Sequence, residues 1–305
     1  MKLLGIWIGV SALALSACGS GGGNADQLSA NSTATQAEIG NTAPPKDRAV
    51  NVSKKLLLEK EDGDISFTLT LNGRTYSAGE SVDFQQFPMG MSESSYQSEE
   101  VKYVKDLSSG TATADAMRKQ HTRDVTKVRM YHQPYSVVFG VWQTDEWVDG
   151  KQVEWAKKGE TTHFEIYTML GQKTTERQMQ TMVGKAVYQG VAFNQKQQGK
   201  LAYQVDFDKR EGSGSITGLH NYGDITLHKA AIGKQVFQEV HNSYGDRSPF
   251  AEGIGIQGKA SGNNLRDATY GLAFFGPQAE EIAGYVENGQ DSPIRDRIIG
   301  LGGKR

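Results

Sequence analysis

Apolar and polar residues alternate along most of the chain from residue 56 onward, with Gly, Asn and Asp between the alternating segments. This pattern predicts short antiparallel strands. Ile65–Leu71 alternates strictly and is followed by Asn72–Gly73, a favoured pair for a type I′ turn, which predicts a hairpin. Asp149–Gly150 predicts a second hairpin. Val125–Trp142 is also strongly β in character, and we expect a bulge or bend near Pro134, because proline cannot donate to a sheet ladder.

The C-terminal part of the chain predicts a closed barrel. Segments with strand character and Gly punctuation are Lys185–Phe193, Gly199–Phe207, Gly212–Leu219, Asp224–Ile232, Phe250–Ala260, Ala268–Phe275 and Ile282–Glu287. Seven or eight antiparallel strands of this length favour closure, which removes exposed edges. Residues expected to fill the interior include Ala202, Val205, Phe207, Ile216, Leu219, Ile225 and Leu227. We therefore predict an all-β fold, with a β-rich N-terminal domain over residues 51–180 and an eight-stranded antiparallel barrel over residues 181–305.

Helix is expected only in short pieces, at Ala112–His121, at Pro277–Ile282, and as a linker or short helix near Gln172–Gln180. Two glycine-rich stretches, near residues 214 and 302, lack the strand-to-helix context and the Lys-Ser/Thr ending of a phosphate loop, and we predict that both are turns. Neither a nucleophile elbow nor paired histidines at helical spacing are found in the sequence. We therefore expect a protein that binds rather than an enzyme.

The N-terminus predicts a lipoprotein signal. Lys2 precedes an apolar run, Leu3–Leu15, which is shorter than the roughly 20 residues that span a bilayer, so residues 1–17 are predicted to be a signal peptide. Leu-Ser-Ala-Cys, ending at Cys18, resembles the bacterial lipobox, which implies that Cys18 is lipidated. Residues 18–50 are rich in Gly, Ser, Asn, Thr and Ala and predict a flexible tether.

The composition changes this picture little. The chain has 33 basic and 35 acidic residues, so no global charge bias favours nucleic acid or an anionic membrane surface. Cys18 is the single cysteine, which excludes an intrachain disulfide. Stability must therefore come from the packed core.

The C-terminal strands resemble a known family. Gly184–Phe193, Gly199–Phe207, Gly212–Gly218 and Tyr270–Gly284 are similar to the C-terminal barrel of a group of Gram-negative surface lipoproteins. The group includes factor H-binding protein, transferrin-binding protein B, the haemoglobin-haptoglobin receptor lipoprotein and the hemophilins. Val128–Phe139 also resembles a strand of the N-terminal domain of these proteins. Because members are exported with a surface lipoprotein assembly modulator, the resemblance implies a lipid-anchored location on the outer membrane, exposed at the cell surface.

The resemblance also implies that the N-terminal domain carries the ligand site. Hemophilins hold haem iron through histidine, so His121 and His132 are candidate haem ligands, the alternative being a structural or solvated role. Aromatic residues dominate protein-binding hot spots and Met adapts to irregular surfaces, although any of these residues could instead belong to the core. The resulting ligand-binding candidates are Tyr131, His132, Tyr135, Trp147, Trp155, Met89 and Met91.

We predict from these observations a surface lipoprotein that binds a host protein, with haemoglobin or its haem as the preferred ligand for iron acquisition. It would work beside a TonB-dependent outer-membrane transporter, with haem as a ligand and no obligatory cofactor. The alternative is a lipoprotein that binds factor H for complement evasion, for which His-to-Ala changes should be silent. A purely structural envelope lipoprotein is the third interpretation.

Overall fold

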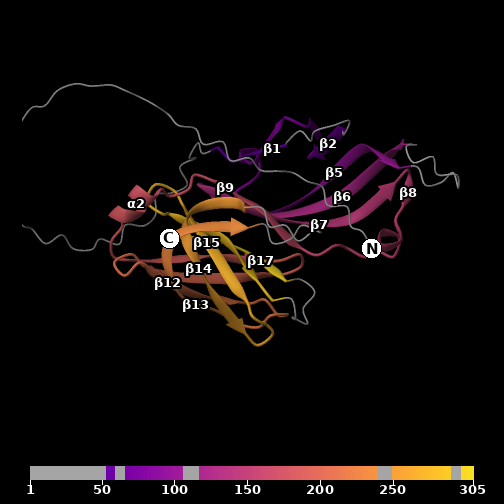
Figure 1. Ribbon diagram of the computed structural model, residues 1–305. Helices are drawn as coiled ribbons and strands as arrows, with labels where there is room; N and C mark the ends of the chain where they lie inside the picture. The colour runs from indigo at the N-terminus through magenta and orange to yellow at the C-terminus, as the bar shows by residue number, and fades with distance from the viewer. Residues whose placement is uncertain (1–52, 59–65, 106–116, 239–248, 290–296) are drawn as a thin grey trace, which may run out of the picture.

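The computed structural model describes residues 53–58, 66–105, 117–238, 249–289 and 297–305. Within these ranges the chain is built almost entirely from strands, with two short α-helices, and the strands form a closed barrel and an open twisted sheet (Figure 1). This confirms the predicted all-β fold with a β-rich N-terminal part and an eight-stranded antiparallel barrel at the C-terminus. The predicted signal peptide, Cys18 and the whole of the predicted tether lie outside the described residues.

The barrel contains eight strands in sequence order, each antiparallel to its neighbours. Its last strand pairs with its first, Leu301 opposite Ala192, which closes the cylinder. The strands are β10 (Lys185–Phe193), β11 (Gln198–Asp206), β12 (Glu211–Thr217), β13 (Ile225–Gln238), β14 (Pro249–Gly262), β15 (Thr269–Phe275), β16 (Glu281–Glu287) and β17 (Ile298–Lys304).

The barrel interior is filled with side chains. Tyr203 and Tyr270 are buried and their hydroxyls lie 3.0 Å apart, while the Tyr188 hydroxyl donates to a backbone carbonyl at 2.6 Å. Six predicted interior residues are buried as expected: Val205, Phe207, Ile216, Leu219, Ile225 and Leu227. The seventh, Ala202, is exposed, because strand alternation turns its neighbours Leu201 and Tyr203 inward instead.

The N-terminal part is a sheet with the strand order β3-β2-β5-β6-β7-β8, to which β9 is added through β7. The elements are β2 (Ser66–Leu71), β3 (Arg74–Ser77), β5 (Gly90–Lys105), β6 (Met117–His132), β7 (Ser136–Val148), β8 (Lys151–Gln152) and β9 (Glu165–Gly171). A separate two-stranded sheet is formed by β1 (Lys55–Leu57) and β4 (Ser81–Asp83), and the 3-10 turn η1 (Phe84–Gln86) follows it. The helices are α1 (Glu154–Lys157) and α2 (Glu176–Thr181).

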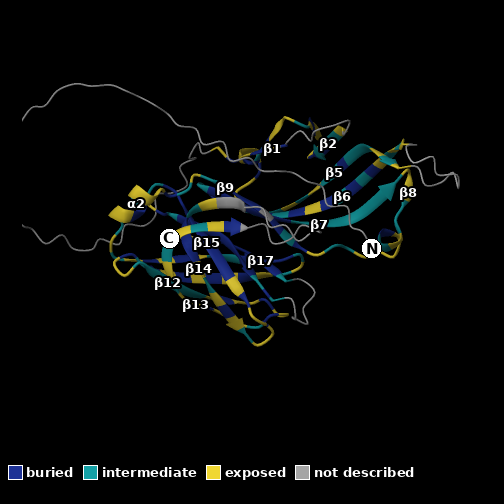
Figure 2. Ribbon diagram, viewed as in Figure 1, coloured by how far each residue is buried: buried dark blue, intermediate teal, exposed yellow. Residues whose placement is uncertain are grey.

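The two faces of this sheet pack against different layers. One face buries Val128 and Met130 with the apolar residues of β1, β4 and η1. The opposite face, which we call the barrel-side face, packs Val138 and Trp142 in one cluster with Phe193 of the barrel. β5, β6 and β7 continue past the barrel, and much of their outer half is only partly buried (Figure 2). The sheet is therefore anchored on the barrel at one end and extends beyond it at the other.

Several local predictions are confirmed by the backbone. Asn72–Gly73 joins β2 to β3 and Asp149–Gly150 joins β7 to β8, with positive φ at all four residues as a type I′ turn requires. The polar segment near Gln172–Gln180 contains α2, which begins with a capping box between Thr175 and Gln178. Turn chemistry was thus readable from the sequence.

Other local predictions were wrong. Residues 117–121 of the expected helix Ala112–His121 belong to β6, and its remaining residues lie outside the described ranges. Pro277–Ile282 forms a turn that leads into β16. Both glycine-rich stretches expected to be turns are strands, β12 and β17. The bend expected near Pro134 is a complete reversal, which places His132 of β6 opposite Val137 of β7.

Candidate functional site

A buried polar cluster joins the sheet to the barrel. Glu281, at the start of β16, is 2% exposed and accepts a hydrogen bond from the Tyr135 backbone N–H at 3.0 Å and another from the Ser136 hydroxyl at 2.8 Å. Gln133 donates to the Ser136 Oγ at 2.9 Å and to the Ile282 carbonyl at 3.2 Å. Burial raises the pKa of Glu281 to about 7, although both hydrogen bonds and the nearby Lys54 favour the ionised form. The reversal between β6 and β7 is thereby fixed to the barrel.

Lys54 enters the same cluster from the segment just before β1. Its ammonium, although the residue is 1% exposed, donates to the Gln133 carbonyl at 2.7 Å and lies 2.8 Å from the His132 Nε2. An ammonium can only donate, so Nε2 accepts and the His132 Nδ1 carries the proton that is donated to the Phe87 carbonyl at 3.0 Å. Burial, and then the charge of Lys54, lower the pKa of His132. Both ring nitrogens are occupied within the protein, which leaves neither free for haem iron.

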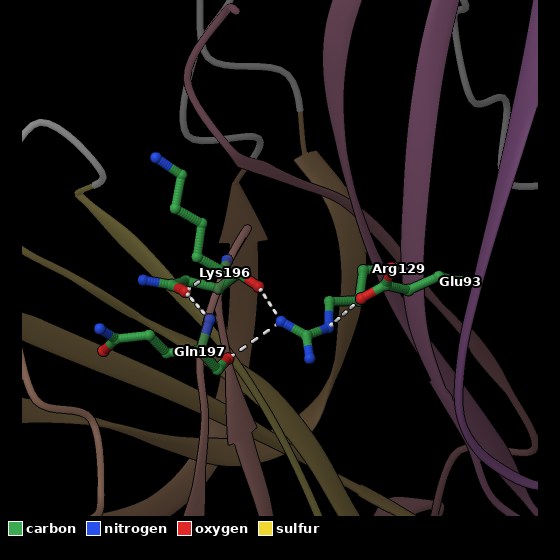
Figure 3. Close-up of polar contacts among 5 residues, drawn as sticks. Glu93, Arg129, Lys196 and Gln197 are labelled. Atoms are coloured by element: carbon green, nitrogen blue, oxygen red, sulfur yellow. Dashed lines mark hydrogen bonds and ion pairs between the residues drawn. The ribbon is translucent and has the colours of Figure 1, made fainter.

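Arg129 forms a second contact between the two parts (Figure 3). Its guanidinium donates to the carbonyls of Asn194 at 2.8 Å and Gln197 at 3.1 Å, in the loop between β10 and β11, and its Nε forms an ion pair with Glu93 of β5 at 3.1 Å. The Asn194 side chain closes that loop by accepting the backbone N–H groups of Lys196 and Gln197. One arginine of the sheet is therefore held by a turn of the barrel.

The outer half of the barrel-side face carries stacked cationic and aromatic residues. The register places Arg123 opposite Trp147, and the Arg123 guanidinium lies 4.0 Å from the centre of the Trp147 ring. Four residues further out along β6, Lys119 faces Tyr103 with its ammonium 5.7 Å from that ring centre. These are cation–π contacts on a solvated sheet face. His121 lies between the two rows, half-exposed and 3.6 Å from a carboxylate oxygen of Glu99.

The opposite face of the same outer half is polar and buried. Asp124, adjacent to Arg123, is 7% exposed and accepts a hydrogen bond from the Gln143 amide at 2.7 Å. Burial and the nearby Glu146 raise the pKa of Asp124 to about 7. Glu146 in turn accepts the indole N–H of Trp155 at 3.1 Å.

A shallow polar hollow of about 570 Å³ adjoins the cationic and aromatic residues. It lies beside β2, β5 and β6, and among the residues that line it are Thr70, Glu93, Ser95, Gln97, Val125 and Lys127. By strand alternation these six side chains lie on the barrel-side face. The hollow and the stacked pairs thus form one continuous surface.

The predicted ligand-binding residues lie in different environments, some in the core and some at the surface. Tyr131 and Tyr135 are partly buried against the core that is shared with the barrel, and burial raises the pKa of both. Met91 packs against the same core, whereas Met89 is 55% exposed. The candidates therefore do not converge on one pocket, and Trp147 and His121 are the two on the partly exposed outer half of the barrel-side face.

Sequence reasoning missed Arg129 and Glu281, which join the sheet to the barrel, and Lys54, which bonds to the reversal between β6 and β7. No local pattern marks them, because their partners lie far away along the chain. Across the described ranges, no group of three or more His, Cys, Asp or Glu residues could hold a metal ion. The same ranges contain no helix that is long and apolar enough to cross a membrane.

These features define a two-part β protein in which a barrel packed with side chains supports an open sheet face, an architecture that offers surfaces for binding. Residues 177–286 match the family model described as Factor H binding protein, C-terminal. The match begins in α2 and extends into β16. The predicted similarity of the C-terminal strands to factor H-binding protein is therefore confirmed over residues 177–286, which include β10 to β15 and most of β16.

Proposed function

We propose that this chain is a lipid-anchored lipoprotein of the bacterial cell surface that binds a host protein, with factor H, the complement regulator, as the first ligand to test. The observation that carries the proposal is the match of residues 177–286 to the factor H binding protein C-terminal family, together with the closed eight-stranded barrel that those residues help to build. The lipobox resemblance at Cys18 supports the anchor.

Haemoglobin or haem remains the second candidate. It follows from the wider resemblance to iron-acquiring surface lipoproteins, and His121 is the candidate haem ligand whose ring is half-exposed. His132 supports this ligand less well, because its two ring nitrogens already bond with Lys54 and Phe87. Export by a surface lipoprotein assembly modulator and partnership with a TonB-dependent transporter belong to the same proposal.

The experiment is a binding assay with the purified full-length chain, captured in detergent and exposed separately to factor H and to haemoglobin. Saturable factor H binding without a Soret band in the complex supports complement evasion. Haemoglobin binding, or a Soret band that is lost in His121→Ala but kept in His163→Ala, supports iron capture. Retention of neither ligand contradicts both forms of the proposal.

The location is tested on intact cells that express the chain. We expect a labelled fatty acid to be incorporated by the native sequence and not by Cys18→Ala. An antibody against the barrel should stain unpermeabilised cells that express the native sequence. Staining only after permeabilisation would contradict surface exposure while leaving the lipid anchor intact.

A further inference from the structure

We infer that the host protein is bound by the outer half of the barrel-side face, and that the part of the partner that contacts this face is acidic. This inference rests on the proposed function and adds to it a surface and a chemistry. The surface consists of the outward side chains of β5, β6 and β7, centred on Tyr103, Met117, Lys119, Arg123 and Trp147, and it continues into the polar hollow beside Lys127.

The first argument is exposure of large side chains. Tyr103 of β5 is 43% exposed and Met117 of β6 is 53% exposed, whereas Thr122 and Asp124, on the other face of β6, are buried. A pair of neighbouring strands that buries polar residues on one face and exposes an aromatic ring and a methionine on the other reverses the usual arrangement for a sheet with one solvated face. Exposed apolar groups of this kind mark interaction surfaces.

The second argument is that long side chains on this surface are already held in place before a partner binds. The Arg123 guanidinium lies over the Trp147 ring, and the Lys119 ammonium lies near the Tyr103 ring, so these long side chains are already held in place. Immobilising a flexible side chain on binding costs about 0.5–1.5 kcal/mol, which a preordered side chain largely avoids. Arg, Trp and Tyr are also the residue types most enriched in binding hot spots.

The third argument is charge. The chain carries a net charge of −2, yet this face carries five basic residues against three acidic ones: Lys105, Lys119, Arg123, Lys127 and Arg129 against Glu93, Glu99 and Asp145. Glu93 already pairs with Arg129, and Glu99 faces His121. This surface is net positive although the whole chain is net negative, which favours a partner with an acidic contact face. Electrostatic attraction of this kind mainly speeds association.

The fourth argument is size. β5 and β6 lie side by side over the eleven residues from Met117 to Lys127, roughly 34 Å at about 3.4 Å per residue, and β7 adds a third strand only from Thr122 onward. With strands about 4.8 Å apart, the resulting area of about 400 Å² is about half of the roughly 800 Å² that each partner buries in a standard interface. The surface suits a folded protein module rather than a small molecule.

The test compares variants of the full-length chain against immobilised human plasma proteins, first factor H and then haemoglobin, with a mass-spectrometric survey of proteins captured from whole plasma. Arg123→Glu reverses the central charge and Trp147→Ala removes its ring. Lys200→Glu makes the same charge reversal on an exposed position of β11 in the barrel and is the matched control. Arg123→Lys keeps the charge and removes the planar stack.

We expect Arg123→Glu and Trp147→Ala each to weaken binding of the captured protein by about tenfold or more, as hot-spot residues do. Lys200→Glu should bind as the native chain does, and Arg123→Lys should lose less than Arg123→Glu. Association should also slow as salt is raised. Thermal unfolding of each variant shows that the sheet is intact.

Two results overturn the inference in distinguishable ways. If the native chain binds a plasma protein and all four variants bind it equally, the binding surface lies elsewhere and the proposed function stands. If the native chain captures no plasma protein at all, the proposed function fails and the surface assignment fails with it.

Discussion

Replacing Glu281 with glutamine tests the polar cluster between sheet and barrel. The carboxyl group is buried, and its pKa is raised to about 7 from an ordinary value of 4.5. The folded state therefore binds this proton more tightly than the unfolded chain does. The resulting stability is fully present below pH 4.5 and is lost as the pH rises through about 7, by about 3 kcal/mol in total.

Glu281→Gln keeps the size of the side chain and removes its charge. The amide oxygen can still accept the Tyr135 N–H, and the Ser136 hydroxyl can rotate to accept from the new NH₂ group. We expect the variant to match the native chain at pH 4.5 and to exceed its free energy of unfolding at pH 8 by up to about 3 kcal/mol. Loss of the charge near Lys54 reduces this gain, because that ammonium is also buried.

The assay is urea unfolding of the full-length chain, followed by tryptophan fluorescence, at several pH values between 4.5 and 8. Glu160→Gln, at an exposed position, is the control and should follow the native chain throughout. The informative quantity is the difference in free energy of unfolding between the variant and the native chain at each pH. Asp124 and His132 also make stability depend on pH, but they do so equally in both proteins, and the difference removes their effect. A difference that does not change between pH 4.5 and pH 8 would refute the reasoning.

Three further predictions concern single contacts. Asp124→Asn should raise the free energy of unfolding at pH 8 more than at pH 5, because the pKa of Asp124 is also raised to about 7, and equal effects at both pH values would contradict that burial. Arg129→Ala should lower the free energy of unfolding by about 1–3 kcal/mol by removing charged hydrogen bonds to two carbonyls, as measured by urea unfolding, whereas an unchanged midpoint would show that the contact contributes nothing. Gly190→Ala should destabilise the barrel strongly, because its Cβ would meet the backbone of β17, and Gly233→Ala, where the nearest atom is 3.6 Å away, should not; similar melting temperatures for the two would contradict this packing.

Much of the fold could be predicted from strand alternation and turn chemistry. Asn72–Gly73 and Asp149–Gly150 fixed two hairpins, and the segments predicted in the barrel correspond to β10 through β16. Strand β17 was missed because glycines in a short window are typical of a turn. In the structure Gly302 leaves room for the Tyr131 ring and Gly300 for the Phe193 ring, and this requirement depends on residues far away in the sequence.

The candidate site was less predictable for the same reason. Trp147 stays a predicted ligand-binding residue, and its partner Arg123 is evident only from the strand register. Histidine is a common metal ligand, yet the Nε2 of His132 is bonded to Lys54, which lies 78 residues earlier in the chain. Residue type suggests chemistry, whereas burial and partners depend on how distant strands meet.

The position of Lys54 has a mechanical consequence. If the chain is held to a membrane through residues that precede it, any pull on the molecule reaches the described fold beside Lys54, whose ammonium bonds to the β6–β7 reversal, and then β1, which pairs with β4. Drag from a bound host protein would therefore load the junction between sheet and barrel first. The hydrogen bonds of the buried Lys54 ammonium would then be among the first to carry that force, and their strength would limit how much force the tethered molecule withstands before it begins to unfold.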